Sequence, residues 1–194
     1  MRTAQIARKT AETEIQLELT LEGGEAKIAT GLSFFDHMLA QLAKHGGMGL
    51  KVQAKGDAQV DSHHLVEDVG LALGDALRTA LGDRAGIARF GEAHQSMDET
   101  LARVVVDLSG RPYCVFDAKL PSVVLGDGFQ VEMVREFFIA LAMRGQLNLH
   151  AAILYGENTH HQVEALFKGL ARALKQAVRV EGGGPPSTKG TLTA

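Results

Sequence analysis

The sequence predicts an α+β fold built from one unit that occurs twice in the chain. Each half of the 194 residues runs in the order strand, strand, helix, strand, helix. The hexapeptide SHHLVE at residues 62–67 returns as THHQVE at 159–164, each time just before a long amphipathic pattern. We therefore expect a duplicated domain with half-repeats at 1–90 and 91–182, followed by a C-terminal tail at 183–194.

The first half changes from a strand pattern to a helix pattern and back. Residues 13–22 carry an apolar side chain at every second position, which is typical of a half-buried strand. Gly23-Gly24 predicts a hairpin turn to a second strand at 25–30. Apolar residues then recur at helical spacing from Phe34, and His45-Gly46-Gly47 ends that helix. The last two elements are a strand at 49–60 and a helix to Leu81, capped by Asp61 or Ser62.

The second half repeats this order. Residues 102–109 and 112–118 are strand-like on either side of Ser109-Gly110, and a loop to Gly128 follows. The remaining elements are a helix with Val131 to Leu141 on its apolar face, a strand at 146–155 and a helix from Asn158 or Thr159 to Val178. The tail EGGGPPSTKG is irregular and polar.

Composition excludes several classes of protein. The net charge is −3 and aromatic residues make up only 5%, which argues against a broad basic or base-stacking surface for nucleic acid. The longest apolar run, Phe137 to Met143, is too short to cross a bilayer, and the N-terminus lacks the apolar stretch of a secretion signal. The single cysteine, Cys114, cannot form an intrachain disulfide. We expect a soluble cytoplasmic protein that binds neither nucleic acid nor membrane.

The two HHxxE motifs predict two metal centres. Residues four apart on a helix are neighbours, so His63 with Glu67, and His160 with Glu164, can each bind one ion. The second histidines, His64 and His161, point about 100° away around the helix and would serve a different ion. Imidazole and carboxylate without thiolate favour a divalent ion such as Mn, Fe, Zn or Co over a structural zinc of the cysteine type. The competing interpretation, a histidine pair that merely starts a helix, is weakened because the pair occurs twice in register.

Other polar residues are less informative by themselves. His37, next to Asp36, could equally be a partly buried structural histidine, and we interpret His45 and His150 as structural. His94, followed by Asp98 and Glu99, fits either a site or a solvated strand end. Arg111 and the segment Ser187-Thr188-Lys189-Gly190 could bind a phosphate, although a short polar tail usually has no such role.

Nine segments match one family in its own order: RKTAET (8–13), FFDHML (34–39), DSHHLVED (61–68), ARFG (88–91), MDE (97–99), LSGRPY (108–113), NLH (148–150), LYGENTHHQVEALFKGLARAL (154–174) and PSTKG (186–190). Through these segments, which span nearly the whole chain, the sequence resembles the imidazoleglycerol-phosphate dehydratases of histidine biosynthesis. The double HHxxE combined with the terminal STKG is highly specific. The resemblance implies two four-stranded sheets flanking a layer of helices, and a shell of 24 subunits with two manganese ions per subunit at the subunit interfaces.

The resemblance also assigns the metal ligands. One manganese would be bound by His37, His64, His160 and Glu164, and the other by His63, Glu67, His161 and position 136. This division agrees with the helical geometry, since each centre receives one His/Glu pair and one crossed histidine. Many family members carry histidine at position 136, whereas this chain has Glu136. A carboxylate still suits manganese, so we retain Glu136 as a ligand.

The implied reaction removes water from D-erythro-imidazoleglycerol phosphate and yields imidazoleacetol phosphate. Two metals flanking the imidazole would stabilise its deprotonated form, which helps expel the neighbouring hydroxyl. Proton transfer is assigned to Glu12, Asp98 and Glu164, with Glu164 favoured as base and Glu12 as the alternative. The resemblance further implies that Glu12 and the metal ligands other than Glu136 contact the substrate. The phosphate would be bound by Arg89, Arg111, Lys168, Ser187, Thr188 and Lys189.

Two other functions fit part of the sequence. A dinuclear metallohydrolase acting on phosphate esters would use His/Glu clusters, but it typically needs bridging carboxylates at strand ends, and no Asp-x-His strand motif occurs here. A metal-storage or metal-bridged assembly protein would need no phosphate-binding set. Formation of the ketone product from imidazoleglycerol phosphate with Mn²⁺ would distinguish the dehydratase from both.

Overall fold

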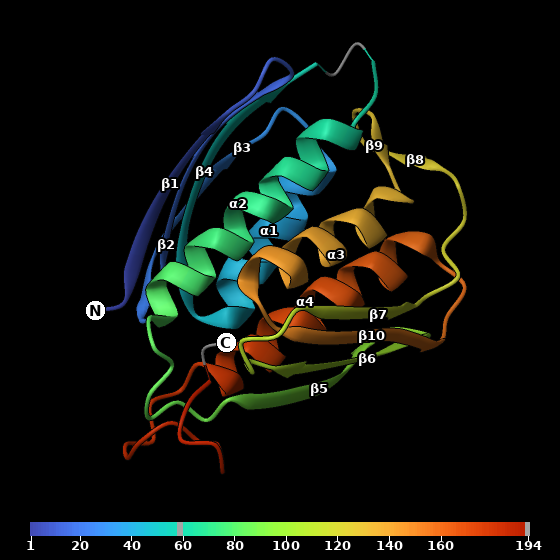
Figure 1. Cartoon of the computed structure of the whole chain (residues 1–194). Helices are drawn as coiled ribbons and strands as arrows, with labels where there is room; N and C mark the ends of the chain where they lie inside the picture. The colour runs from blue at the N-terminus through green and yellow to red at the C-terminus, as the bar shows by residue number, and fades with distance from the viewer. Residues whose placement is uncertain (58–59, 193–194) are drawn as a thin grey trace.

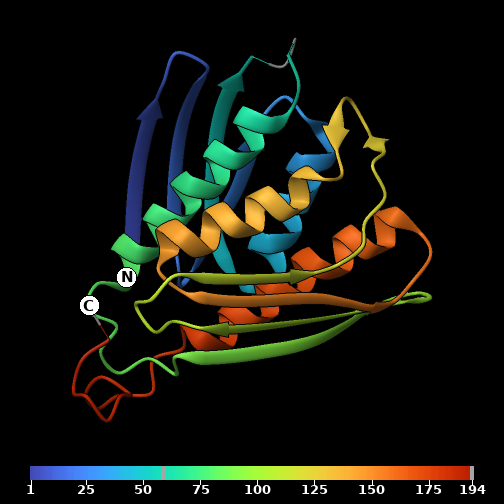
Figure 2. The same ribbon diagram turned by 45° about the vertical axis from the view of Figure 1, so that its right-hand side comes forward.

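The computed structural model describes residues 1–57 and 60–192. Two four-stranded sheets enclose a layer of four helices, as Figures 1 and 2 show from two directions. The first sheet lies against α2 and α1, and the second lies against α4 and α3 (Figure 2). This arrangement confirms the predicted α+β fold with helices between two sheets.

The first unit forms a sheet with the strand order β1-β2-β4-β3. Strand β3 runs parallel to β4, and the other neighbours are antiparallel. Alternate residues of β2, such as Ile15, Leu17 and Leu19, are buried against the helices, as their spacing predicts. The elements of this unit are β1 (Thr3–Lys9), β2 (Thr13–Thr20), β3 (Gly23–Ala29), α1 (Ser33–Gly46), β4 (Met48–Gly56) and α2 (His63–Leu81).

The second unit repeats this topology. Its sheet has the order β5-β6-β10-β7, in which β10 is antiparallel to β6 and parallel to β7. The shared order and strand directions are those expected of a duplicated unit. The elements are β5 (Phe90–Met97), β6 (Thr100–Asp107), β7 (Tyr113–Asp117), the short hairpin β8 (Val124–Leu125) and β9 (Phe129–Gln130), α3 (Met133–Gly145), β10 (Asn148–Tyr155) and α4 (Thr159–Ala177).

The structure corrects the predicted order of elements. Each half begins with one more strand than predicted, β1 in the first unit and β5 in the second, so that each sheet has four strands. The segment predicted as a loop before Gly128 contains β8, and the strand predicted at 49–60 ends at Gly56. Part of that predicted strand, residues 58–59, lies outside the described residues, as do residues 193–194 of the predicted tail. The division of the chain at residues 90 and 182 stays a prediction.

Helices α2 and α3 pack closely because α2 carries glycine at the crossing. A Cβ added at Gly70 would lie 2.9 Å from the carbonyl oxygen of Phe137, and one at Gly74 would lie 2.8 Å from the Cβ of Arg144. Next to this contact, the rings of Phe137 and Phe167 stack with centroids 5.2 Å apart. The helical layer is therefore a rigid base for the polar side chains at the helix ends. No helix in the described part of the chain is long and apolar enough to span a bilayer.

Candidate metal centre and phosphate cleft

Both histidine pairs lie in the first turn of a helix whose start is fixed by a side-chain cap. The Asn158 side chain accepts the backbone N–H of His161 at 3.2 Å at the start of α4. At the start of α2 the Asp61 carboxylate accepts the backbone N–H of His63 at 2.8 Å. Ser62 is the N-cap residue of α2, but its side chain makes no capping bond, and the bond to His63 comes from Asp61 just before it. In α4 the N-cap residue is Asn158 rather than Thr159.

His37, His160 and Glu164 form the most compact polar cluster. The Nε2 atoms of His160 and His37 lie 3.0 Å and 3.2 Å from the same carboxylate oxygen of Glu164. The other oxygen of Glu164 is 2.6 Å from the ammonium of Lys168. Burial acts to raise the pKa of Glu164, but the bonds from Lys168, His160 and His37 outweigh it and lower the pKa below the ordinary value. Glu164 is therefore a buried but ionised carboxylate.

A second cluster joins α2 to the first sheet. The Nδ1 atom of His64 lies 3.0 Å from Asp57 and 3.7 Å from Glu12. The bond to Asp57 raises the pKa of His64, with smaller contributions from the charges of Glu12 and Asp57. When neutral His64 donates from Nδ1 to Asp57, its Nε2 is left with a lone pair for a ligand.

His161 has an equivalent partner in the second unit. Its Nδ1 atom lies 2.7 Å from Glu99, and its Nε2 atom lies 3.7 Å from Asp98. Glu99 is held in place by the backbone N–H groups of Asn158 and Glu157, at 2.8 Å and 3.1 Å. These bonds, together with the one to His161, strongly lower the pKa of Glu99. Both second histidines therefore face a carboxylate on the Nδ1 side.

A single chain does not bring together either of the two predicted sets of four metal ligands. His63 lies 3.5 Å from Glu67, as the helical spacing predicts, but His161 is paired elsewhere. Glu136, the expected fourth ligand of that set, contacts Arg135 at 2.9 Å. In the other set His37, His160 and Glu164 come together, whereas His64 belongs to the separate group with Glu12 and Asp57.

The donor types fit a divalent ion. Among the described residues, two groups have ligand atoms within 4.8 Å of one another: His37, His160 and Glu164, and Glu12, Asp57 and His64. Both groups offer imidazole nitrogen and carboxylate oxygen without thiolate, the donor set expected for Mn²⁺ and similar ions. The side chains of His37 and His160 are each 45% exposed, so the first group is open to solvent.

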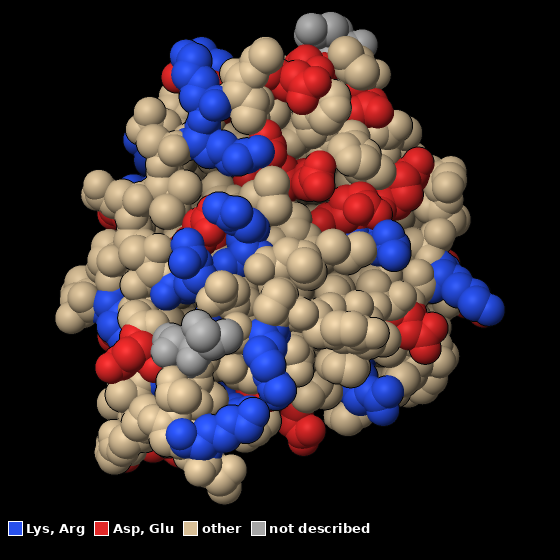
Figure 3. All heavy atoms as spheres, viewed as in Figure 1, with Lys and Arg blue, Asp and Glu red and all other residues tan. Residues whose placement is uncertain are grey.

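The predicted phosphate residues, apart from Lys168, line a cleft of about 680 Å³ beside the tail. Figure 3 shows basic side chains spread over the left half of its view, including the lower left, where Figure 1 places the tail. The Arg89 guanidinium binds Asp107 at 2.7 Å and the carbonyl oxygen of Pro186 at 2.8 Å, so it anchors the tail. Lys168 lies instead at Glu164. The lining residues are Arg89, Ser109, Arg111, Pro186, Ser187, Thr188, Lys189, Thr191 and Leu192.

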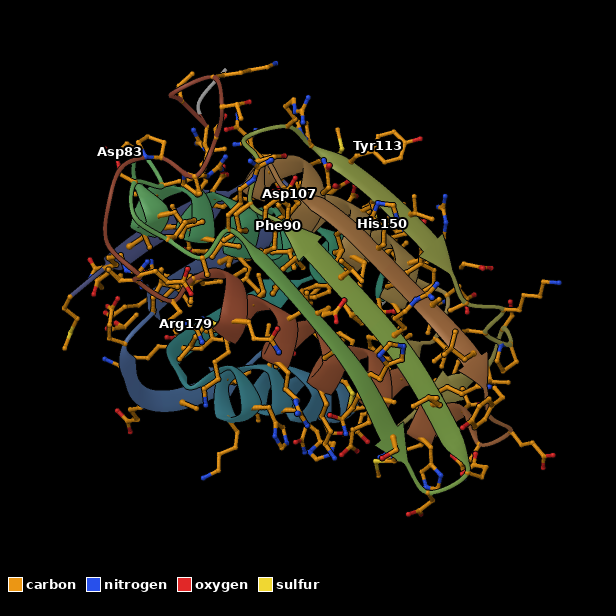
Figure 4. The ribbon with its side chains drawn as sticks, turned by 90° about the horizontal axis from the view of Figure 1, so that it is seen from below. Asp83, Phe90, Asp107, Tyr113, His150 and Arg179 are labelled. Carbon is orange, nitrogen blue, oxygen red and sulfur yellow. The ribbon has the colours of Figure 1, made fainter. Side chains whose placement is uncertain are left out.

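Three further histidines, His45, His94 and His150, lie outside these clusters. His45 bonds to Gln41 at 2.9 Å, and burial is the main reason why its pKa is lowered. His150 lies on the outer face of the second sheet (Figure 4), and His94 is exposed on β5. Sequence reasoning missed Asp57, the partner of His64, and gave Glu99 no definite role.

The fold and these clusters define a duplicated α+β protein with candidate divalent-metal sites and a separate basic cleft. The sequence profile of the family described as imidazoleglycerol-phosphate dehydratase matches residues 30–174. A relative of that name from Lacticaseibacillus casei (strain BL23) is 56% identical over 195 residues, covering 99% of this chain and 100% of the relative. Another, from Anaeromyxobacter sp. (strain K), is 55% identical over 193 residues, covering 98% and 92%. The chain belongs to the imidazoleglycerol-phosphate dehydratase family.

Solved structures agree with this assignment. The imidazoleglycerol-phosphate dehydratase from Staphylococcus aureus subsp. aureus N315 is similar with a TM-score of 0.83 and 37% identity, over 92% of this chain and 99% of that one. The enzyme from Pyrococcus furiosus in complex with (S)-C348 is similar with a TM-score of 0.82 and 39% identity, over 96% and 99%. The relatives are named as dehydratases, and this chain is accordingly an enzyme of the dehydratase class.

Proposed function

We propose that this protein removes water from D-erythro-imidazoleglycerol phosphate to form imidazoleacetol phosphate, a cytoplasmic step of L-histidine biosynthesis. The observation that carries the proposal is the open cluster of His37, His160 and Glu164 in a chain that also has a cleft lined by Arg111 and Lys189. A metal store would account for the cluster alone, and a metallohydrolase acting on phosphate esters would typically need bridging carboxylates at strand ends. Membership of the dehydratase family favours a reaction that needs both the metal cluster and the phosphate cleft.

The proposal includes two Mn²⁺ ions per subunit and a shell of 24 subunits. One ion would be held by His37, His160, Glu164 and a His64, the other by His63, Glu67, Glu136 and a His161. Because one chain does not bring these sets together, the crossed histidines would come from neighbouring subunits. A bound divalent ion would act as a Lewis acid that stabilises negative charge on the substrate.

The residues of the chain supply the proton transfers. A carboxylate takes the proton from the carbon that bears the second hydroxyl, and the hydroxyl next to the imidazole leaves with a proton as water. The resulting enol becomes the ketone by moving one proton from oxygen to carbon. Glu164 is ionised and can therefore accept a proton, while the bond from Lys168 lowers its pKa and makes it a weaker base than a free carboxylate. Glu12 and Asp98, with side chains 54% and 80% exposed, are the further candidates for proton donor and acceptor.

The substrate phosphate would lie in the cleft beside the tail. Arg111, Ser187 and Lys189 line this cleft and offer charged and neutral donors to a phosphate dianion, with Thr188 beside them. Lys168 is positioned at Glu164 and would reach the phosphate only in a site shared between subunits. Arg89 would contribute mainly by holding Pro186 and Asp107.

The test is a direct assay combined with a metal count. Purified protein loaded with Mn²⁺ should convert imidazoleglycerol phosphate to a ketone, and Lys189→Ala should lower kcat/KM roughly tenfold to a hundredfold. His63→Ala and His64→Ala should each retain about one ion per subunit and lose most activity, because the two histidines serve different ions. Lys27→Ala, on the outer face of the first sheet, is the control. Absence of ketone formation with Mn²⁺ bound would reject the function; two ions retained in both histidine variants would reject the ligand assignment.

A further inference from the structure

Arg84 is a buried cation that bonds to no acidic side chain in the described part of the chain. It lies between α2 and β5, is 1% exposed and has a φ of 60°. Its guanidinium donates to the carbonyl oxygen of Gly145 at 2.9 Å and to that of Leu192 at 3.5 Å. Its Nε atom has no hydrogen-bond partner among residues 1–57 and 60–192. Asp107, an acidic group whose charge acts on Arg84, is already bound to Arg89 at 2.7 Å.

Such a group is costly for a protein to bury. The free-energy cost of removing a charge from water is offset only by an opposite charge or by complete hydrogen bonding. Two carbonyl oxygens provide no opposite charge and only part of the hydrogen bonding. Burial accordingly lowers the pKa of Arg84. An aliphatic side chain of similar length would fill the same volume without this cost. Since no carboxylate among residues 1–57 and 60–192 bonds to Arg84, we look for its counter-charge in an anion bound at the neighbouring cleft.

The guanidinium lies directly behind the wall of the phosphate cleft. Leu192, which accepts its hydrogen bond, lines the cleft, and so do Ser109 and Arg111. Gly110 lies between Ser109 and Arg111, and because it has no side chain, Arg84 and Leu192 of the tail can both approach its backbone. A Cβ at Gly110 would lie 1.8 Å from the carbonyl oxygen of Leu192 and 2.8 Å from Nη1 of Arg84. In Figure 4 the neighbouring Asp83 lies beside the loop of the tail.

We propose that Arg84 is a positioning residue whose buried charge is balanced by the phosphate group of the substrate in this cleft. The proposal rests on the proposed function, because it assumes that the cleft binds phosphate. Arg89 is already neutralised by Asp107, so Arg84 would join Arg111 and Lys189 as the third cation acting on the dianion. It would do so across the tail without touching the ligand. A charge in a dry site acts more strongly than the same charge in water.

The experiment compares charged and uncharged replacements in the full, metal-loaded enzyme. Binding of inorganic phosphate is measured by calorimetry, and KM and kcat are measured with imidazoleglycerol phosphate. Arg84→Gln and Arg84→Met should weaken phosphate binding and raise KM roughly tenfold to a hundredfold, with kcat within about twofold. Arg84→Lys, which keeps the charge, should remain within about threefold of wild type. Lys51→Gln, which removes an exposed charge paired with Glu18 on the outer face of the first sheet, is the control and should change neither value.

Each outcome decides the question. Equal phosphate binding in wild type and the uncharged variants overturns the proposal. Phosphate binding in Arg84→Lys that is as weak as in Arg84→Met also overturns it. If both uncharged variants fail to fold, the double variant Arg111→Ala/Lys189→Ala replaces them, since it keeps Arg84 behind the cleft. Residual phosphate binding in that variant supports the proposal, and complete loss overturns it. If wild type itself neither binds phosphate nor forms ketone, the proposed function fails and this proposal fails with it.

Discussion

Replacement of Glu99 by glutamine tests whether carboxylates orient the histidines that we propose as metal ligands. One oxygen of Glu99 accepts the backbone N–H groups of Asn158 and Glu157, and the other faces Nδ1 of His161 at 2.7 Å. In Glu99→Gln the amide oxygen must stay with the two backbone donors, so the amide NH₂ turns toward His161. Nδ1 of His161 can then only accept, which moves the ring proton to Nε2 and removes the lone pair from that nitrogen.

The expected result is a loss of metal affinity at the centre that His161 serves. Loss of such a histidine partner typically weakens metal binding 10- to 100-fold. The bond to Glu99 raises the pKa of His161. This interaction therefore stabilises the folded protein at acid pH, and its contribution is lost as the pH rises through the pKa of His161 in the folded state. In metal-free Glu99→Gln the pKa of His161 should fall, and the stabilisation at acid pH should fall with it.

The assay is titration of metal-free protein with Mn²⁺ against a competing chelator, together with a proton NMR titration of the histidine rings. Glu14→Gln, which removes an exposed carboxylate paired with Lys9, is the control and should bind Mn²⁺ like wild type. The centre containing Glu164 should keep its affinity in Glu99→Gln. The reasoning is refuted if both classes of site in this variant bind Mn²⁺ as tightly as wild type, or if the pKa of His161 does not fall.

Three further predictions concern stability, the cysteine and the assembly. Asp68→Ala should lower the free energy of unfolding by about 2–3 kcal/mol in urea, because Asp68 is 8% exposed and accepts bonds from Thr13 and Arg8; equal stability would contradict this. Burial raises the pKa of Cys114 to about 11, so iodoacetamide at pH 8 should alkylate it roughly a hundredfold more slowly in the folded than in the unfolded chain. Removal of metal with EDTA should split the large particle and Mn²⁺ should restore it, as followed by light scattering; unchanged particle size after verified metal removal would exclude metal sites between subunits.

Sequence reasoning missed strands β1 and β5, whose side chains on the helix-facing side are mostly small or polar. In β5 the residues facing α4 include Gly91 and Ala93, and a Cβ at Gly91 would lie 1.9 Å from the carbonyl oxygen of Ala173. Close approach of α4 requires a small residue there, and small residues give a weak alternation signal. In β1 only Ala4 is fully buried, because β1 is an edge strand. In contrast, β2 and β6 lie inside their sheets and carry the large alternating residues that were predicted.

In the candidate site, too, sequence reasoning predicted the contacts within one element and missed those between elements. The pairs His160/Glu164 and His63/Glu67 follow from helical spacing, and the structure places their atoms 3.0 Å and 3.5 Å apart. Asp57 and Glu99 reach their histidines from the end of a strand and from a hairpin turn. No spacing within one element encodes those contacts, since they depend on how helix and sheet pack.

Duplication of the unit explains why the candidate site is open in a single chain. In each motif the first histidine turns to its own glutamate, while the second turns away to a carboxylate from the neighbouring sheet. Two equivalent half-sites therefore arise on different helices, and the group built on His160 is separate from the group that contains His64. The group of His37, His160 and Glu164 already offers three ligands within one chain, so a fourth ligand from His64, as proposed, would have to come from a different copy. The half-exposed His37 and His160 rings present the surface that such a second copy would cover.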